Sequence, residues 1–81
     1  MQLVYVINVK NKKLVTAVGE RIRDLRIKNK MSQEALANEA DVPLSQIGRI
    51  ERGENNPTIS TLHVIAMALG IDLKTLLDIK I

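Results

Sequence analysis

The chain of 81 residues has no cysteine, no tryptophan and no phenylalanine, and Tyr5 is its only aromatic residue. Without cysteine the chain has neither a disulfide framework nor a thiolate ligand for a metal ion. Without several aromatic rings it has no platform on which unpaired bases stack. We therefore exclude a disulfide-stabilised scaffold, a thiolate metal site and stacking-type binding of single-stranded nucleic acid.

Long apolar runs are also missing. The run near the start, LVYVI, has five residues, whereas a membrane span requires roughly 18. No basic segment followed by a long apolar stretch marks a secretory signal. We expect an intracellular, cytoplasmic protein with no membrane partner, built as one small domain that gains stability from oligomerisation.

Groups that perform catalysis are scarce. His63 is the only histidine, and the chain has no Gly-rich phosphate loop. Glu34, Glu39 and Asp78 are scattered at predicted helix surfaces or ends and form no convincing catalytic pair. We interpret His63 as a surface or dimer-contact residue and expect no enzymatic activity, no cofactor and no metal ion.

Charge is distributed unevenly along the chain. The net charge is +3, but residues 1–31 carry eight Lys or Arg and two acids, while residues 32–81 carry four Lys or Arg and seven acids. This asymmetry favours a polyanionic partner. A charged helix face is more often simply solvated, so charge alone does not identify DNA.

Hydrophobic periodicity predicts a leading strand followed by a long helix. Residues 1–10 are rich in β-branched side chains and alternate in polarity, which is typical of a strand. A helix is predicted over 14–28, and we divide the chain into a strand extension, 1–13, and a helical domain, 14–81. The apolar stripe of this first helix consists of Leu14, Val18, Ile22 and Leu25.

Two short helices are predicted next. Ser32 is a good N-cap for a helix that reaches about Glu39. A turn over 41–43 follows, and Pro43 suits the first turn of the next helix because its missing N–H needs no partner there. We expect that helix to end at Gly53.

Two more helices complete the predicted domain. Pro57 and Thr58 open one of them, and Gly70 supplies its left-handed stop. Asp72 caps the last, short helix. The residues expected to face the core from these two helices are Leu62, Ile65, Ala66, Leu69, Leu73, Leu76 and Leu77.

The stretch 33–52 is the most informative part of the chain. It contains two short amphipathic helices joined by a tight turn, and the small Ala37 allows the second helix to cross the first closely, as in a helix-turn-helix. Such units mostly read DNA. The inward positions of this unit are Leu36, Ala37, Ala40, Val42, Ile47 and Ile50.

The outward face of the second of these helices presents groups that read bases. At 100° per residue, Ser45, Arg49 and Arg52 lie opposite the buried isoleucines, with Gly48 beside them. Arg49 is the best candidate because arginine bonds bidentately to guanine in the major groove. Leu44 either touches a thymine methyl group or only pads the turn. Gly48 permits either close approach of another surface or tight packing against the helix before it. The candidate base-reading residues are Arg49, Ser45, Leu44 and Gly48.

Phosphate-binding candidates lie at two predicted helix N-termini, where backbone N–H groups and the helix dipole attract anions. Gln33 opens the helix after Ser32 and is either a phosphate ligand or a solvated amide. Asn55, Asn56 and Thr58 flank the helix after Pro57, although turn chemistry alone also explains the two asparagines. The candidate phosphate-binding residues are Gln33, Gln46, Arg52, Asn55, Asn56 and Thr58.

The run from about Val18 to Ile79 resembles the lambda-repressor-like, Xre-type helix-turn-helix family. The motifs that carry the resemblance are SQEALA, SQIGRIERG, NPTISTL and ALGI. The resemblance implies an all-α, five-helix domain that binds double-stranded operator DNA as a two-fold homodimer and regulates transcription, usually as a repressor. It also implies that the third helix, about 43–52, enters the major groove.

The resemblance further implies an ion pair between Arg26 and Glu51, which ties the first helix to the third. Helical geometry agrees, because each of the two residues flanks an apolar stripe. Three residues depart from the family pattern. Asp41 and Lys30 stand where Gly is common, and Pro43 stands where many members have Ser or Thr.

An alternative function is a protein-interaction module, for example an antitoxin that holds a toxin. Ile27, Val64 and Met67 fall on the outward sides of their helices, which leaves more apolar surface than a monomer needs. We prefer a homodimer interface as the explanation. The strand over 1–10 either pairs with its symmetry mate or covers the core of its own chain, and the sequence leaves both arrangements open.

Overall fold

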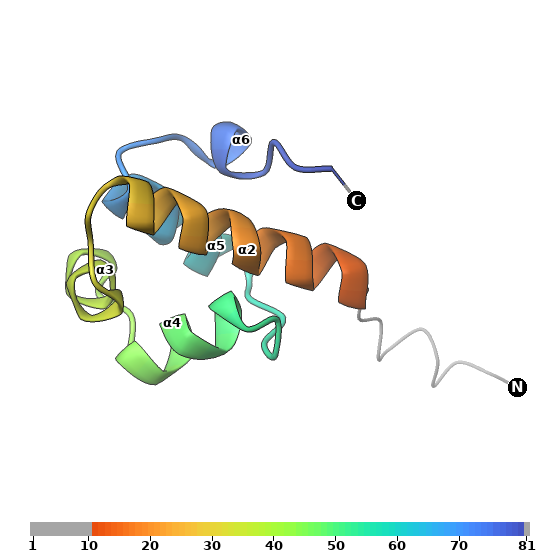
Figure 1. Ribbon diagram of the computed structural model, residues 1–81, viewed down its shortest axis with the longest axis horizontal. Coiled ribbons are helices and arrows are strands. Elements are labelled where there is room, and N and C mark those ends of the chain that lie inside the picture. The colour runs from red at the N-terminus through yellow and green to blue at the C-terminus, as the bar shows by residue number, and fades with distance from the viewer. Residues whose placement is uncertain (1–10, 81) are drawn as a thin grey trace, which may run out of the picture.

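The structure is a computed structural model that describes residues 11–80, which form five α-helices and no strand (Figure 1). The strand predicted over 1–10 lies outside the described residues. In chain order the helices are α2 (Lys12–Lys28), α3 (Gln33–Ala40), α4 (Leu44–Glu51), α5 (Ile59–Ala68) and α6 (Leu73–Leu76).

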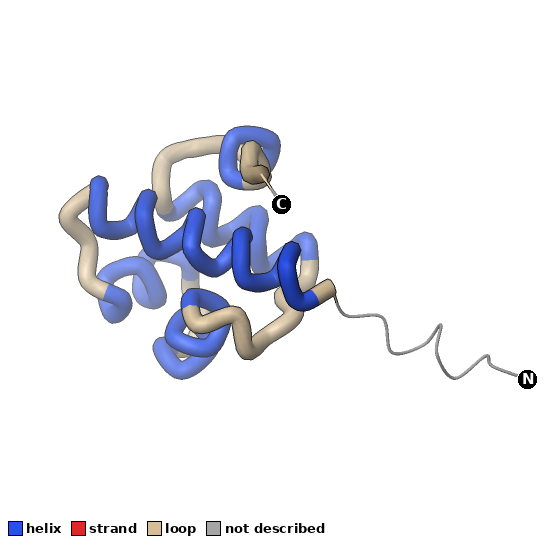
Figure 2. The backbone as a smooth tube through the Cα atoms, turned by 45° about the vertical axis from the view of Figure 1, so that its right-hand side comes forward, coloured by secondary structure: helices blue, strands red, loops and turns tan. Residues whose placement is uncertain are grey.

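The long helix α2 organises the other four. It packs against α4 and α6, which lie below and above it in Figure 1, while α3 packs against α4 and α5, and α5 against α6. Figure 2 shows that only short loops join the helices. In Figure 1, both helices of the helix-turn-helix pair, α3 and α4, lie below α2.

Helix α2 begins at Lys12, two residues earlier than predicted. Asn11 is its N-cap, because the Asn11 Oδ1 atom accepts a hydrogen bond of 3.0 Å from the N–H of Leu14. The polar residues that were expected only to end the strand thus include the capping residue of the helix. The division of the chain at residue 13 stays a prediction.

The predicted caps of three later helices are present. Ser32 Oγ accepts from the Ala35 N–H at 2.9 Å, Thr58 Oγ1 from the Thr61 N–H at 3.1 Å, and Asp72 Oδ1 from the Thr75 N–H at 2.8 Å. Each bond satisfies a first-turn donor that has no partner within its helix.

Helix α4 is shorter at both ends than the sequence suggests. Pro43 is its N-cap, with an extended ψ of 140°, and not a residue of its first turn, and no side chain caps the helix. The helix ends at Glu51, and Gly53 follows with a φ of +73°. Gly53 is the left-handed residue that stops the helix, because its N–H donates to the carbonyl oxygen of Ile50 at 3.0 Å and the N–H of Glu54 donates to that of Arg49 at 2.9 Å.

The core lies where all five helices meet. It contains the predicted apolar positions of the helix-turn-helix except Val42, which packs against it partly buried, and most of those of α5 and α6. The buried cluster consists of Val18, Ile22, Leu36, Ala37, Ala40, Ile47, Ile50, Leu62, Ile65, Ala66, Leu69 and Leu76.

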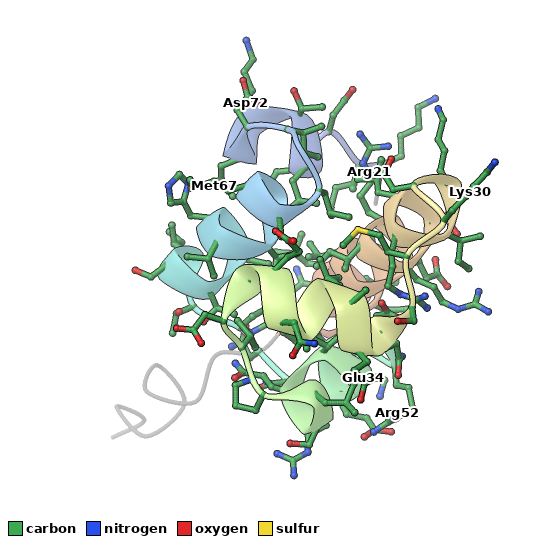
Figure 3. The ribbon with its side chains drawn as sticks, turned by 90° about the vertical axis from the view of Figure 1, so that its left-hand side faces the viewer. Arg21, Lys30, Glu34, Arg52, Met67 and Asp72 are labelled. Atoms are coloured by element: carbon green, nitrogen blue, oxygen red, sulfur yellow. The ribbon has the colours of Figure 1, made fainter. Side chains whose placement is uncertain are left out.

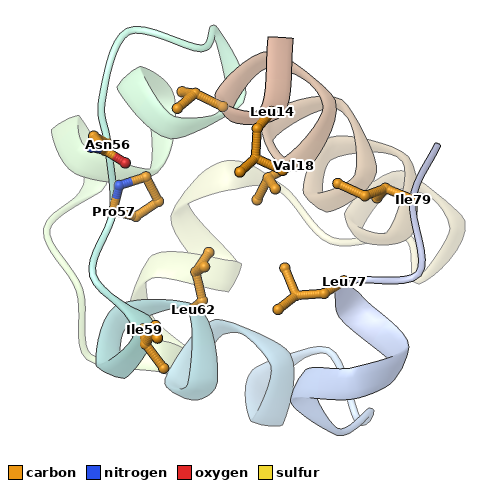
Figure 4. Close-up of a pocket in the computed structure, with 9 residues that line it drawn as sticks. Leu14, Val18, Asn56, Pro57, Ile59, Leu62, Leu77 and Ile79 are labelled. Carbon is orange, nitrogen blue, oxygen red and sulfur yellow. The ribbon is translucent and has the colours of Figure 1, made fainter. Parts of the chain in front are cut away.

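Leu14 and Leu77 were expected to face this core, and that expectation is wrong. They are 37% and 39% exposed, whereas Val15, the neighbour of Leu14, is buried. Both leucines line an open apolar groove between the start of α2, the start of α5 and the segment after α6 (Figure 4). Each lies near a helix end, where few neighbouring turns remain to cover a side chain.

Among residues 11–80, two non-glycine residues adopt left-handed backbone conformations, Lys30 with a φ of 59° and Asp41 with a φ of 56°. Lys30 lies between α2 and α3, and Asp41 is the C-cap of α3. These are two of the positions at which the sequence departs from the family pattern by lacking glycine. The backbone thus keeps the conformation that glycine favours, at an energetic cost.

Gly19 permits close approach of α2 to the end of α4. A Cβ atom built at this residue would collide with the carbonyl oxygen of Ile50 and would lie 3.1 Å from that of Glu51. The absence of a side chain therefore lets α2 pack directly on the C-terminal backbone of α4. The sequence analysis overlooked this residue.

Candidate nucleic-acid interface

Helix α4 has one buried side and one exposed polar side. Ile47 and Ile50 are 0% and 1% exposed, which anchors the helix in the core. Ser45 and Arg49 are exposed on the other side, and Leu44 is 47% exposed at the start of the helix. The structure therefore places three of the four candidate base-reading residues at the surface.

The fourth candidate, Gly48, is buried, and the group nearest to it is the side chain of Arg52. The atoms nearest to a Cβ built at Gly48 all belong to the Arg52 guanidinium, with Nη1 at 3.0 Å. No atom of α3 is among them. The side chain of Arg52, the C-cap of the same helix, therefore lies over Gly48.

Arg52 is held in place by Glu54. Its Nε atom donates to Glu54 Oε2 at 3.0 Å and its Nη2 atom donates to Oε1 at 3.3 Å. This hydrogen bonding raises the pKa of Arg52 above its ordinary value, so the group is a permanent cation. The two side chains are 58% and 56% exposed.

The structure contains the ion pair between Arg26 and Glu51 that the resemblance implied. The Arg26 Nε and Nη2 atoms donate to the two carboxylate oxygens of Glu51, at 2.6 Å and 3.0 Å. Arg26 Nη1 also donates to the carbonyl oxygen of Met31, at 2.8 Å. One guanidinium therefore fixes α2, the loop before α3 and the end of α4 relative to one another.

Gln33 joins the same network. Its Nε2 atom donates to Glu51 Oε1 at 3.0 Å, across 18 residues of sequence. The side-chain amide that we predicted to hold a phosphate is thus bound to a carboxylate in this structure. The backbone N–H of Gln33 still lies in the first turn of α3, where helix N-termini attract anions.

The loop between α4 and α5 carries the remaining phosphate-binding candidates. The Thr58 hydroxyl oxygen caps α5, and its O–H donates to Thr61 Oγ1 at 3.0 Å. Asn55 is half-buried, and Asn56 is exposed and lines the apolar groove. Gln46, on α4, is partly exposed.

The sequence analysis missed the role of Glu54 in this interface. A carboxylate two residues after Arg52 does not stand out in the sequence, because charged residues are common in the loops that follow helices. The signal that points to it is an arginine at the helix C-cap, four residues after a glycine within the helix. In that arrangement the guanidinium lies against bare backbone, where a carboxylate from the following loop can reach it.

Among residues 11–80, no group of three histidines, cysteines or acids is arranged to hold a metal ion. In the same part of the chain, each helix is too short or too polar to cross a membrane.

Two short helices joined by a three-residue turn, with the second anchored by isoleucines and polar on its outer side, define a helix-turn-helix protein. The comparison with protein families agrees. The family model HTH_3, described as helix-turn-helix, matches residues 22–76. The chain belongs to this family, which confirms the resemblance seen in its motifs.

Named relatives share most of the chain. It is 43% identical over 61 residues to the control protein C.BamHI of Bacillus amyloliquefaciens, covering 74% of this chain and 75% of that protein. It is 41% identical over 59 residues to the immunity repressor protein of Bacillus phage phi105, covering 73% of this chain and 41% of the repressor.

A solved structure agrees in fold. The restriction-modification controller protein C.AhdI from Aeromonas hydrophila superposes with a TM-score of 0.75 at 34% identity, over 76% of this chain and 94% of that one. The five-helix part of the fold prediction is therefore confirmed.

Proposed function

We propose that this protein is a sequence-specific regulator of transcription, most simply a repressor, that inserts α4 into the major groove of double-stranded DNA. The observation that carries the proposal is the exposed polar side of a helix whose other side is locked in the core. The names of the relatives, a control protein and an immunity repressor, support it.

Arg49 is the proposed base-reading residue. Its side chain is exposed, and none of the described residues forms an ion pair or hydrogen bond with its guanidinium. Its donors are therefore available for the O6 and N7 atoms of a guanine. Ser45 and Leu44 lie earlier on the same helix, where a hydroxyl and an apolar group contact neighbouring base edges.

Two helix N-termini flank α4 and hold the DNA backbone in this proposal. The first turn of α3 presents backbone N–H groups near Gln33, and the first turn of α5 presents them behind the Thr58 cap. Backbone contacts of this kind fix the register of a protein on DNA without reading its sequence. Gln46, Asn55 and Asn56 supply side-chain amides between the two helix ends.

We further propose that the regulator binds as a homodimer. Large apolar side chains remain exposed on the described part of the chain, with Ile59 at 71%, Met67 at 63% and Ile27 at 50%. A second copy buries such side chains and matches a two-fold operator, with half-sites about 34 Å apart or at a multiple of that spacing.

Selection of bound sequences from a pool of random duplexes tests this function. A palindromic consensus with the expected half-site spacing supports a dimeric, sequence-specific regulator. Absence of any enrichment contradicts it and favours the alternative, a protein-interaction module such as an antitoxin. Sedimentation equilibrium at micromolar concentration checks the dimer separately, since a persistent monomer, alone and on DNA, contradicts only that part of the proposal.

A further inference from the structure

Arg52 lies flat against α4 because two features hold it there. Gly48 has no side chain, so the Arg52 guanidinium lies close to the helix backbone. A Cβ atom at Gly48 would be only 3.0 Å from Arg52 Nη1. The Nε and Nη2 atoms on the outer edge of the guanidinium donate to the two carboxylate oxygens of Glu54, at 3.0 Å and 3.3 Å.

The edge that Glu54 occupies is the edge a phosphate needs. Arginine binds carboxylates and phosphates in the same way, through two parallel N–H bonds from one side of the guanidinium. In this structure that side consists of Nε and Nη2, and both donate to Glu54. The Glu54 carboxylate therefore stands in for a DNA phosphate.

The Arg52–Glu54 pair is exposed, so replacing the Glu54 carboxylate with another anion costs little free energy. The Arg52 and Glu54 side chains are 58% and 56% exposed, and ion pairs at such positions contribute little to stability. DNA phosphates in a duplex can therefore compete for Arg52, but each contact requires release of the internal carboxylate.

We propose that Glu54 is an internal competitor that keeps Arg52 off the DNA backbone and so limits binding to DNA of arbitrary sequence. This inference rests on the proposed function, because it concerns the same interface. Phosphate contacts supply nearly all of non-specific affinity. A competitor that weakens one such contact lowers the affinity for DNA of arbitrary sequence and leaves base reading by α4 as a larger share of the affinity for the operator.

The test compares Glu54→Gln with a matched control, Glu34→Gln. Glu34 is an exposed acid in the first turn of α3, and Figure 3 shows it at the same end of the molecule as Arg52. Both variants remove one negative charge near the interface, but only the first releases Arg52. Binding of the full chain to a random duplex is measured over a series of salt concentrations.

We expect Glu54→Gln to tighten binding to random duplex about threefold or more and to steepen the dependence of log affinity on log salt by up to about 0.9, the value for one added phosphate contact. Glu34→Gln should change both quantities less. Adding Arg52→Gln should abolish the gain from Glu54→Gln, because the two side chains act as a unit.

Three results would overturn the inference. The first is an equal gain from the two glutamate variants, and the second is a gain from Glu54→Gln that persists without Arg52, since either reflects charge alone. The third is weaker binding by Glu54→Gln, which means that Glu54 presents Arg52 to DNA. If the wild-type protein selects no sequence from random duplexes, the proposed function itself fails. If the wild-type protein selects a sequence but Glu54→Gln and Glu34→Gln change the affinity for random duplex equally, only this inference fails.

Discussion

Arg26 and Glu51 form a bidentate ion pair that joins α2 to the last residue of α4, with N···O distances of 2.6 Å and 3.0 Å. The two side chains are only 11% and 2% exposed. The orientation of α4, and with it the polar face proposed to read DNA, depends on this pair and on the Gln33 amide that shares it.

Replacing Glu51 with alanine should therefore destabilise the fold strongly. The change leaves a mostly buried guanidinium without its partner, which costs about 3–5 kcal/mol. Glu54→Ala is the control, because its partner Arg52 is exposed and surface ion pairs contribute little to stability. Thermal unfolding of both variants measures the difference. Equal melting temperatures would contradict the claim that the Arg26–Glu51 pair stabilises the fold.

Gly19→Ala should also destabilise the protein. The new methyl group would collide with backbone, the carbonyl oxygen of Ile50, and overpacking of this kind costs about 1–3 kcal/mol or more. Gly48→Ala is the control, because its methyl group meets only the flexible end of Arg52 and because alanine favours helices by about 1 kcal/mol. Urea denaturation should show a loss for the first variant and none for the second. A loss for Gly48→Ala equal to that for Gly19→Ala contradicts this reasoning.

Lys30→Gly should stabilise the protein. Lys30 has a φ of 59°, and a left-handed conformation costs a residue with a side chain roughly 1–2 kcal/mol. Glycine removes that strain but loses about 0.5–1 kcal/mol through its flexible unfolded state, so we expect a net gain of about 0.5–1 kcal/mol. Arg23→Gly, at an exposed position in the interior of α2, should instead cost about 1 kcal/mol. The same denaturation measurement decides the sign, and destabilisation by both changes would refute the argument.

Acid should weaken the last helix through Asp72. Its carboxylate accepts hydrogen bonds from the side chain and the backbone N–H of Thr75, which lowers its pKa below the ordinary value. Because the folded pKa is depressed, the stabilisation is complete above roughly pH 4 and is lost as the pH falls through the lower, folded value. An NMR titration of the Asp72 carboxyl group measures this shift. In Thr75→Ala the pKa should move partway back, since the backbone bond remains, and an unchanged pKa would contradict the assigned cause.

Much of the fold could be predicted from the sequence because helical periodicity and capping chemistry are local. Ile47 and Ile50 repeat at helical spacing, and Ser32 and Asp72 are recognisable caps. Leu14 and Leu77 could not be placed correctly, because the burial of a residue near a helix end depends on which other elements cover it.

The interface was predictable in outline but not in its contacts. The exposed position of Arg49 follows from its angle relative to the isoleucines. The bond from Gln33 to Glu51 joins residues 18 positions apart, so helical geometry within either element does not reveal it. The covering of Gly48 by Arg52 likewise depends on Glu54, which lies in the following loop.

Binding of Arg49→Ala to the selected operator and to a random duplex, at the same salt concentration, tests the central claim most directly. Lys74→Ala, an exposed cation on α6, which lies across α2 from α4 in Figure 1, controls for loss of one positive charge. If Arg49 reads a base, its loss costs about 1–3 kcal/mol on the operator and far less on random DNA, while Lys74→Ala has little effect on either. An equal loss on both duplexes would contradict the account.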